Sequence, residues 1–148
     1  GERLHAAGID AARVDLLPPV GRAQYLDSYS QVDILLDTFP YPGGTTTAEA
    51  LWMGVPTLTL AMPGMLGRQG QAMLSNLGLH DWVTHSEAEY VAQAVAWGQG
   101  GDQVAERLQS LRQQVRSQAA SSPLFDAPRF ARDWWAAMQG LWRQKMVA

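Results

Sequence analysis

The amino-acid sequence predicts an α/β fold, namely an incomplete doubly wound (Rossmann-like) parallel sheet followed by C-terminal helices. Short apolar runs alternate with segments of helical periodicity, and the connections between them are short. The chain has 148 residues, of which 47% are hydrophobic and 17% charged, so it suits one compact domain with a real core. Only four strands are recognisable, and we therefore expect the sheet to be incomplete.

The first part of the chain begins the strand–helix alternation. After a helical remnant at residues 2–8, Arg13–Leu17 is a β-like run that is closed by two prolines. Residues 22–29 carry helical periodicity. Val32–Leu36 is apolar at nearly every position, which is typical of a parallel strand buried on both faces.

The middle of the chain continues the same order. A helix from Thr46 to Met53 ends at Gly54, because glycine is a common helix terminator. The next strand is Thr57–Leu60. A helix over residues 68–77 and a third buried strand, Trp82–Thr84, follow.

The last third is entirely helical. Ser86 is predicted to cap a helix over residues 87–97, with Glu89 in capping-box register, and further helices span residues 102–118 and 127–146. In the last helix, apolar side chains recur at helical spacing and form one broad stripe. We expect most of this stripe to be core and part of it to be an interface. Its members are Phe130, Trp134, Met138, Leu141, Trp142 and Met146.

Composition excludes several classes of protein. The formal net charge is −3 and no basic run occurs, so nucleic acid and anionic membranes are poor partners. The absence of cysteine excludes disulfides, thiolate zinc sites and cysteine nucleophiles. No signal peptide or spanning segment is visible, and we expect a cytoplasmic protein. The chain begins at Gly1 without an initiator Met, which we interpret as a piece of a longer protein.

The most informative segment lies between Asp33 and Pro56, where a strand, a Gly/Pro loop and a helix follow one another. The first turn of such a helix presents free backbone N–H groups and the positive end of the helix dipole. Three threonines stand there after two glycines, and Glu49 follows. This junction predicts an anion site that fits a diphosphate with a ribose beside it.

Glu49 has two interpretations. If Thr46 is the N-cap, Thr46-x-x-Glu49 is a capping box that needs no ligand. Three consecutive threonines are poor helix formers, however, so a helix built only for stability would not begin this way. Both interpretations can hold together, since Thr46 can cap while Thr45 and Thr47 face a phosphate.

Other polar residues are weaker candidates. Neither a phosphate-loop motif nor a dinucleotide fingerprint occurs. Asp37, at a strand end, could face the ligand or cap a turn, and Arg68 could meet a phosphate or pair locally. The three histidines lie outside every motif, and no His, Asp and Glu cluster has metal-ligand spacing.

Several blocks resemble the C-terminal catalytic lobe of the O-linked N-acetylglucosamine transferase family, with its Spindly-type plant and bacterial relatives. The resemblance covers nearly the whole chain. The matching blocks are Tyr25-Leu26 with Tyr29, Asp33–Tyr41, Thr45–Glu49, Leu51–Pro56, Arg68–Gly70, Leu77–Leu79, Ser121–Asp126, Phe130 and Trp142.

The resemblance implies a two-lobed type B glycosyltransferase fold. Residues 1–120 would form the nucleotide-sugar-binding lobe, truncated at its N-terminus, and residues 121–148 a helix that packs back on this lobe or on a missing partner lobe. Thr45 and Thr46 would bind the diphosphate, with Thr47 beside them, and Glu49 would accept from the ribose hydroxyls.

At three further positions the family has residues that bind the nucleotide, and this chain matches or replaces them. Arg22 lies where members have Lys or Arg near the nucleotide, and Tyr25 where some have His beside the base. Gly44 replaces a phosphate-binding His of the animal enzymes, which leaves the threonines and backbone amides as the expected cradle. The resemblance implies neither a metal nor another cofactor.

The implied reaction is inverting transfer of a sugar, N-acetylglucosamine from UDP-GlcNAc or fucose from a guanosine nucleotide, to a Ser or Thr hydroxyl. The parent would carry tetratricopeptide repeats upstream, and the chain alone would be inactive. The acceptor protein would be bound by the missing parts, and no catalytic base is assigned. The alternatives are transfer to a lipid or polysaccharide, and a non-catalytic interaction domain.

Overall fold

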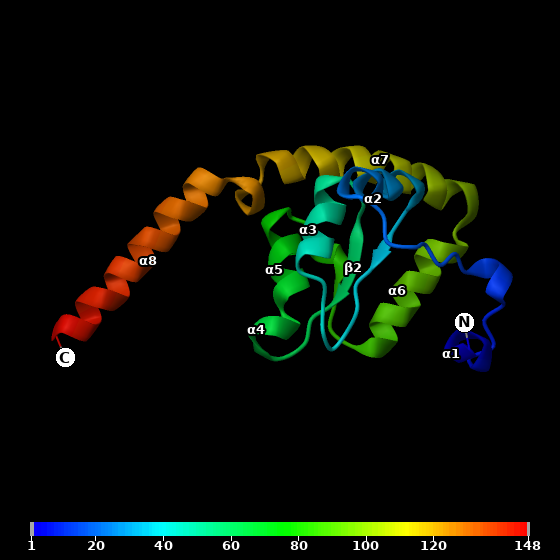
Figure 1. The fold of residues 1–148 in the computed structure, drawn as a ribbon, viewed down its shortest axis with the longest axis horizontal. Coiled ribbons are helices and arrows are strands. Elements are labelled where there is room, and N and C mark those ends of the chain that lie inside the picture. Colours follow the sequence, from blue (N-terminus) through cyan, green and yellow to red (C-terminus); the bar gives the residue numbers. More distant parts are fainter. Residues whose placement is uncertain (1, 148) are drawn as a thin grey trace.

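Residues 2–147, which the computed structural model describes, form a three-stranded parallel sheet with helices on both faces (Figure 1). The strands are β1 (Leu35–Leu36), β2 (Thr57–Leu60) and β3 (Val83–Thr84), in the spatial order β1-β2-β3. Leu35 pairs with Thr57, and Thr59 pairs with Val83. The predicted α/β fold with a parallel sheet is confirmed.

Helices connect and cover the strands. Figure 1 shows α3 and α5 on one side of the sheet and α6 on the other. Helices α3 and α5 connect successive parallel strands, and because such crossovers are right-handed, both helices lie on the same face of the sheet. Short 3-10 turns lie at Ala11–Arg13, Tyr29–Gln31, His80–Trp82 and Pro123–Phe125. The α-helices are α1 (Glu2–Ala6), α2 (Arg22–Ser28), α3 (Thr45–Trp52), α4 (Gly64–Gly67), α5 (Gln69–Asn76), α6 (Glu87–Gln99), α7 (Gly101–Ser121) and α8 (Ala127–Val147).

The predicted strand Arg13–Leu17 is wrong. Ala11–Arg13 forms a 3-10 turn, in which the Asp10 carboxylate accepts from the Ala12 N–H at 3.0 Å, and the following residues are irregular. Leu16 and Leu17 are largely exposed. Since a strand persists only where a neighbour satisfies its N–H and C=O groups, an apolar run without a paired strand stays irregular.

Helix boundaries follow the local chemistry closely. Gly54 adopts a positive φ of 81° and terminates α3 as predicted, and Gly78, with φ 74°, terminates α5 in the same way. The helix predicted over residues 68–77 is present as α5, one residue shorter at each end, and Arg68 separates it from the short helix α4, which was not predicted. Ser86 Oγ accepts from the Glu89 N–H at 3.2 Å, so the predicted cap of α6 is confirmed.

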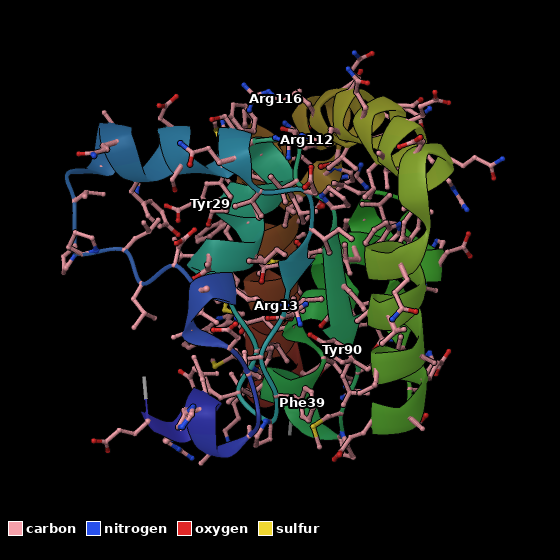
Figure 2. The ribbon with its side chains drawn as sticks, turned by 90° about the vertical axis from the view of Figure 1, so that its right-hand side faces the viewer. Arg13, Tyr29, Phe39, Tyr90, Arg112 and Arg116 are labelled. Atoms are coloured by element: carbon pink, nitrogen blue, oxygen red, sulfur yellow. The ribbon has the colours of Figure 1, made fainter. Side chains whose placement is uncertain are left out.

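The long helix α7 contacts both the segment before β1 and the end of α3. The Arg112 guanidinium donates to the backbone carbonyls of Tyr29, at 3.0 Å, and Val32. Arg116 donates to the Trp52 carbonyl and lies over the Trp52 ring at 4.3 Å. Figure 2 shows both arginines, which belong to α7, with Tyr29 below them. The Arg116 contacts hold Trp52, the last residue of α3, against α7.

The apolar stripe of α8 is exposed, so its predicted place in the core is wrong. Phe130, Trp134 and Trp142 are 65%, 55% and 66% exposed, and Figure 1 shows α8 extending away from the sheet. Helical spacing predicts a shared face but does not say what covers it. None of the helices within residues 2–147 combines the length and apolarity that a membrane span requires.

Candidate functional site

The loop between β1 and α3 is held by a buried carboxylate. Asp37, at the carboxyl end of β1, accepts from the Gly43 N–H at Oδ1 and from the Thr59 hydroxyl at Oδ2, each at 2.7 Å. The Tyr90 hydroxyl donates to the Asp37 carbonyl at 2.8 Å. Of the two roles considered for Asp37, the structure shows the turn-stabilising one, which places the loop directly before α3.

Tyr90 connects this loop to α6. Its ring meets Phe39 edge-on, with centroids 5.4 Å apart, and Figure 2 shows the two side chains together at the carboxyl ends of the strands. Burial, and then the nearby charge of Asp37, raises the pKa of Tyr90 above its ordinary value. The phenol therefore stays protonated and continues to donate its hydrogen bond.

Helix α3 begins at Thr45, one residue earlier than predicted. Its N-cap is Gly44, which has no capping side chain, and the Ala48 N–H to Gly44 carbonyl bond, at 3.0 Å, opens the helix. The predicted capping box of Thr46 and Glu49 is therefore wrong. The N–H groups of Thr45, Thr46 and Thr47 precede that bond and lack helical acceptors, as in the first turn of any α-helix.

The three threonines play different parts. Thr45 and Thr46 are exposed at the helix start, whereas Thr47 is fully buried. Among the described residues, the Thr47 hydroxyl has no hydrogen-bond partner. A Cβ on Gly43 would lie 2.6 Å from that hydroxyl oxygen, so only glycine fits there. Thr45 and Thr46 can thus meet a ligand, while Thr47 packs the loop against the helix.

One face of α3 lines a pocket of about 230 Å³. Thr45 and Glu49 lie four residues apart on this face, which corresponds to about 6 Å along the helix axis. The pocket floor is apolar and aromatic. Its lining residues are Arg22, Leu26, Thr45, Ala48, Glu49, Trp52 and Phe125.

Arg22 and Glu49 form an ion pair at this pocket. Arg22 Nη1 donates to Glu49 Oε1 at 2.8 Å, with the Arg22 side chain 72% exposed and that of Glu49 13% exposed. Glu49 presents one carboxylate oxygen to Arg22, so the other can accept from a hydroxyl group of a ligand. The arrangement offers an anion site at the helix start and an acceptor one turn further along.

Tyr25 lies in the adjoining α2–α3 contact. Its hydroxyl is 2.7 Å from that of Tyr29, which donates to the Thr46 carbonyl at 3.3 Å. Burial, the hydrogen bond with Tyr25, and the Tyr25 and Glu49 charges all raise the pKa of Tyr29. Tyr29 is therefore a neutral donor that links α2 to the first turn of α3.

Sequence reasoning missed several residues near the site. Trp52 and Phe125, whose centroids are 5.0 Å apart, form the pocket floor, and Trp52 could have been found from its i+7 spacing to Thr45. Gln69 lies against Gly44; it belongs to the matching block Arg68–Gly70, but its sequence context gave it no role at the site. Arg68 donates to the Gly64 carbonyl at 3.1 Å, so it is engaged locally.

Comparison with known proteins gives a consistent result. The sequence model of glycosyl transferase family 41 matches residues 3–134. A rice (Oryza sativa subsp. japonica) protein named probable UDP-N-acetylglucosamine–peptide N-acetylglucosaminyltransferase SPINDLY is 41% identical over 93% of this chain. The Caenorhabditis elegans UDP-N-acetylglucosamine–peptide N-acetylglucosaminyltransferase is 27% identical over 93% of it.

The fold also matches a solved structure. A Thermobaculum terrenum O-GlcNAc transferase mutant superimposes with a TM-score of 0.82 and 34% sequence identity over 99% of this chain. The chain corresponds to 28% of that structure's chain, and to 14% of the rice protein. It therefore spans a small part of each relative.

Proposed function

Because this chain belongs to glycosyl transferase family 41, the family of O-GlcNAc transferase and SPINDLY proteins, we propose that it forms the donor-binding part of a protein O-glycosyltransferase. The reaction is transfer of N-acetylglucosamine from UDP-GlcNAc to a Ser or Thr hydroxyl. This sugar and nucleotide appear in the names of the rice and C. elegans relatives. The activity belongs to a longer parent, and the chain alone is inactive.

One observation carries the proposal, namely the single face of α3 that joins the free first-turn N–H groups to Glu49. The helix start favours the diphosphate, because its N–H donors and the positive end of the dipole meet there. The rise of about 6 Å from Thr45 to Glu49 suits a diphosphate followed by its ribose. Arg22 forms an ion pair with Glu49 at the same pocket and so offsets the negative charge that this carboxylate would otherwise place near the diphosphate.

The chemistry that these residues supply is stabilisation of the leaving group. When the sugar leaves with inversion, negative charge grows on the diphosphate, and fixed donors at Thr45 and Thr46 stabilise that charge. Glu49 and the aromatic floor hold the nucleoside and orient the donor. No metal or other cofactor takes part in the proposed reaction. The group that deprotonates the acceptor hydroxyl comes from outside this chain.

The test is a calorimetric titration of the chain with UDP and with GDP. We expect saturable binding of UDP, and about tenfold weaker binding by Glu49→Gln, because that change removes a charged hydrogen-bond acceptor. Glu87→Gln is the matched control, since Glu87 is exposed on α6 away from the pocket. It should bind UDP as the wild type does.

Other outcomes would point elsewhere. Binding of GDP alone would replace the proposed donor with a guanosine diphosphate sugar. A folded chain that binds neither nucleotide would contradict the proposal and favour a non-catalytic interaction domain.

A further inference from the structure

Gln69 lies where the starts of two helices meet. Helices α3 and α5 follow the neighbouring parallel strands β1 and β2, so both begin at the same edge of the sheet. Gln69 is the first residue of α5, and Gly44 is the N-cap of α3. The side chain of Gln69 spans the space between these two positions.

The distances place the Gln69 carboxamide directly over Gly44. A Cβ built on Gly44 would lie 3.4 Å from Gln69 Nε2, 3.6 Å from Oε1 and 3.7 Å from Cδ. The carboxamide thus lies in van der Waals contact with the place that a Cβ at position 44 would take. It does so beside the N–H groups of Thr45 and Thr46, which follow Gly44 in the first turn of α3.

We propose that Gln69 is a further donor-binding residue, whose Nε2–H group donates to a diphosphate oxygen held at the start of α3. This inference rests on the proposed function. A carboxamide has two N–H donors and no charge, so it can add a hydrogen bond to an anion already held by the backbone amides. Gly44, with no side chain, leaves the approach to those amides open.

The site also accounts for the shape of the surrounding loop. The neighbouring Gly70 cannot carry a side chain, since its Cβ would lie 2.6 Å from Asp37 Oδ2. Asp37 in turn holds the Gly43 N–H. The start of α5 and the loop before α3 are therefore fixed to one buried carboxylate, which keeps Gln69 and Gly44 in register.

The experiment compares Gln69→Glu and Gln69→Ala with the wild-type chain. Each is titrated with UDP, GDP and the corresponding nucleosides, uridine and guanosine. For the diphosphate that the wild type binds, we expect about tenfold weaker binding by Gln69→Ala. Gln69→Glu should bind it more weakly still, because a carboxylate replaces a donor beside the phosphates. Nucleoside binding should be the same in all three proteins.

Two controls separate this role from a structural one. Gln71→Glu adds the same charge to α5 but points roughly 200° around the helix, and it should cost less than Gln69→Glu. The carboxylate that Gln69→Glu introduces at the first position of α5 faces the positive end of the helix dipole, so this variant should melt no lower than the wild type. Weaker diphosphate binding by a chain of unchanged melting temperature is the expected signature.

Unchanged diphosphate affinity in both Gln69 variants, or equal losses in Gln69→Glu and Gln71→Glu, would overturn the role of Gln69 and leave the proposed function standing. If the wild-type chain binds neither UDP nor GDP, both the proposed function and the role of Gln69 fail.

Discussion

At the scale of single residues, Glu49 carries the most specific prediction. Its carboxylate pairs with Arg22 through one oxygen, at 2.8 Å, and the other is free to accept from a ribose hydroxyl. We expect the wild-type chain to bind 2′,3′-dideoxy-UDP about tenfold more weakly than UDP. Glu49→Gln should bind the two ligands almost equally. Calorimetry on the four combinations measures this coupling, and a Glu49→Gln protein that still prefers UDP tenfold would refute the ribose contact.

Tyr29 makes the stability of the chain sensitive to alkaline pH. Burial raises its pKa above the ordinary value of 10.0, so the unfolded chain loses this proton at lower pH than the folded chain. The free energy of unfolding should therefore be constant from pH 7 to 9 and fall above pH 10, by about 1.4 kcal/mol per pH unit for each such tyrosine. Urea unfolding at several pH values measures the slope.

Tyr29→Phe separates this contribution from that of Tyr90, whose pKa is also raised by burial. The variant should lose part of the slope above pH 10 and keep the remainder. A slope equal to that of the wild type would show that Tyr29 does not titrate differently on folding.

At the scale of elements, Asp37 determines where the loop before α3 lies. Asp37→Asn replaces one acceptor oxygen by a donor, so either the Gly43 N–H or the Thr59 O–H loses its acceptor. We expect a loss of about 1–3 kcal/mol in the free energy of unfolding. Urea denaturation measures it, with Asp33→Asn as control, because Asp33 is exposed and should change stability by less than about 0.5 kcal/mol. Equal stability of both variants would argue against a structural Asp37.

Gly70 tests the contact between α5 and the same carboxylate. Its Cβ in Gly70→Ala would lie 2.3 Å from the Thr59 hydroxyl oxygen, and overpacking of this kind costs about 1–3 kcal/mol. Gly98→Ala, on α6, has no neighbour within 4 Å and should instead gain up to about 1 kcal/mol. Thermal melts should therefore move in opposite directions, and a harmless Gly70→Ala would contradict this packing.

The elements that the sequence predicted well are those with strong local signals. Gly54, Gly78 and Ser86 determine helix ends through backbone conformation and capping, which neighbouring residues alone decide. The prediction of a strand at Arg13–Leu17 was wrong because strand formation depends on a distant partner. The prediction that the apolar stripe of α8 lies in the core was wrong for a similar reason, since helical periodicity does not tell what covers the stripe.

The sequence predicted the part of the candidate site that lies on one helix, but not the contacts between elements. Thr45, Thr46 and Glu49 belong to one helix, so their common face follows from helical spacing. The Arg22–Glu49 pair joins residues 27 positions apart, and Gln69 meets Gly44 from another helix. Contacts of this kind depend on how the elements pack, which the local pattern does not contain.

At the scale of the whole molecule, α8 presents an aromatic face that residues 2–147 leave uncovered. We propose that a partner lobe covers it in the parent protein. The isolated chain should then associate as its concentration rises, because exposed apolar patches of this kind drive contact. Sedimentation velocity over a concentration series measures the association.

The double variant Trp134→Gln/Trp142→Gln should sediment as a monomer, whereas Gln144→Ala, a change at an exposed polar position of α8, should associate as the wild type does. A wild-type chain that remains monomeric at all concentrations would contradict this interpretation of α8.

The central claim is that the first turn of α3 holds the diphosphate of a nucleotide sugar, with the ribose one turn further along. Amide chemical shifts of the isotope-labelled chain, recorded by NMR during titration with UDP, test it most directly. We predict that the largest changes fall on the amides of Thr45, Thr46 and Thr47, with Glu49 following. Changes confined to another surface, such as the groove beside Trp97 and Arg107 between α6 and α7, would contradict the assignment of the site.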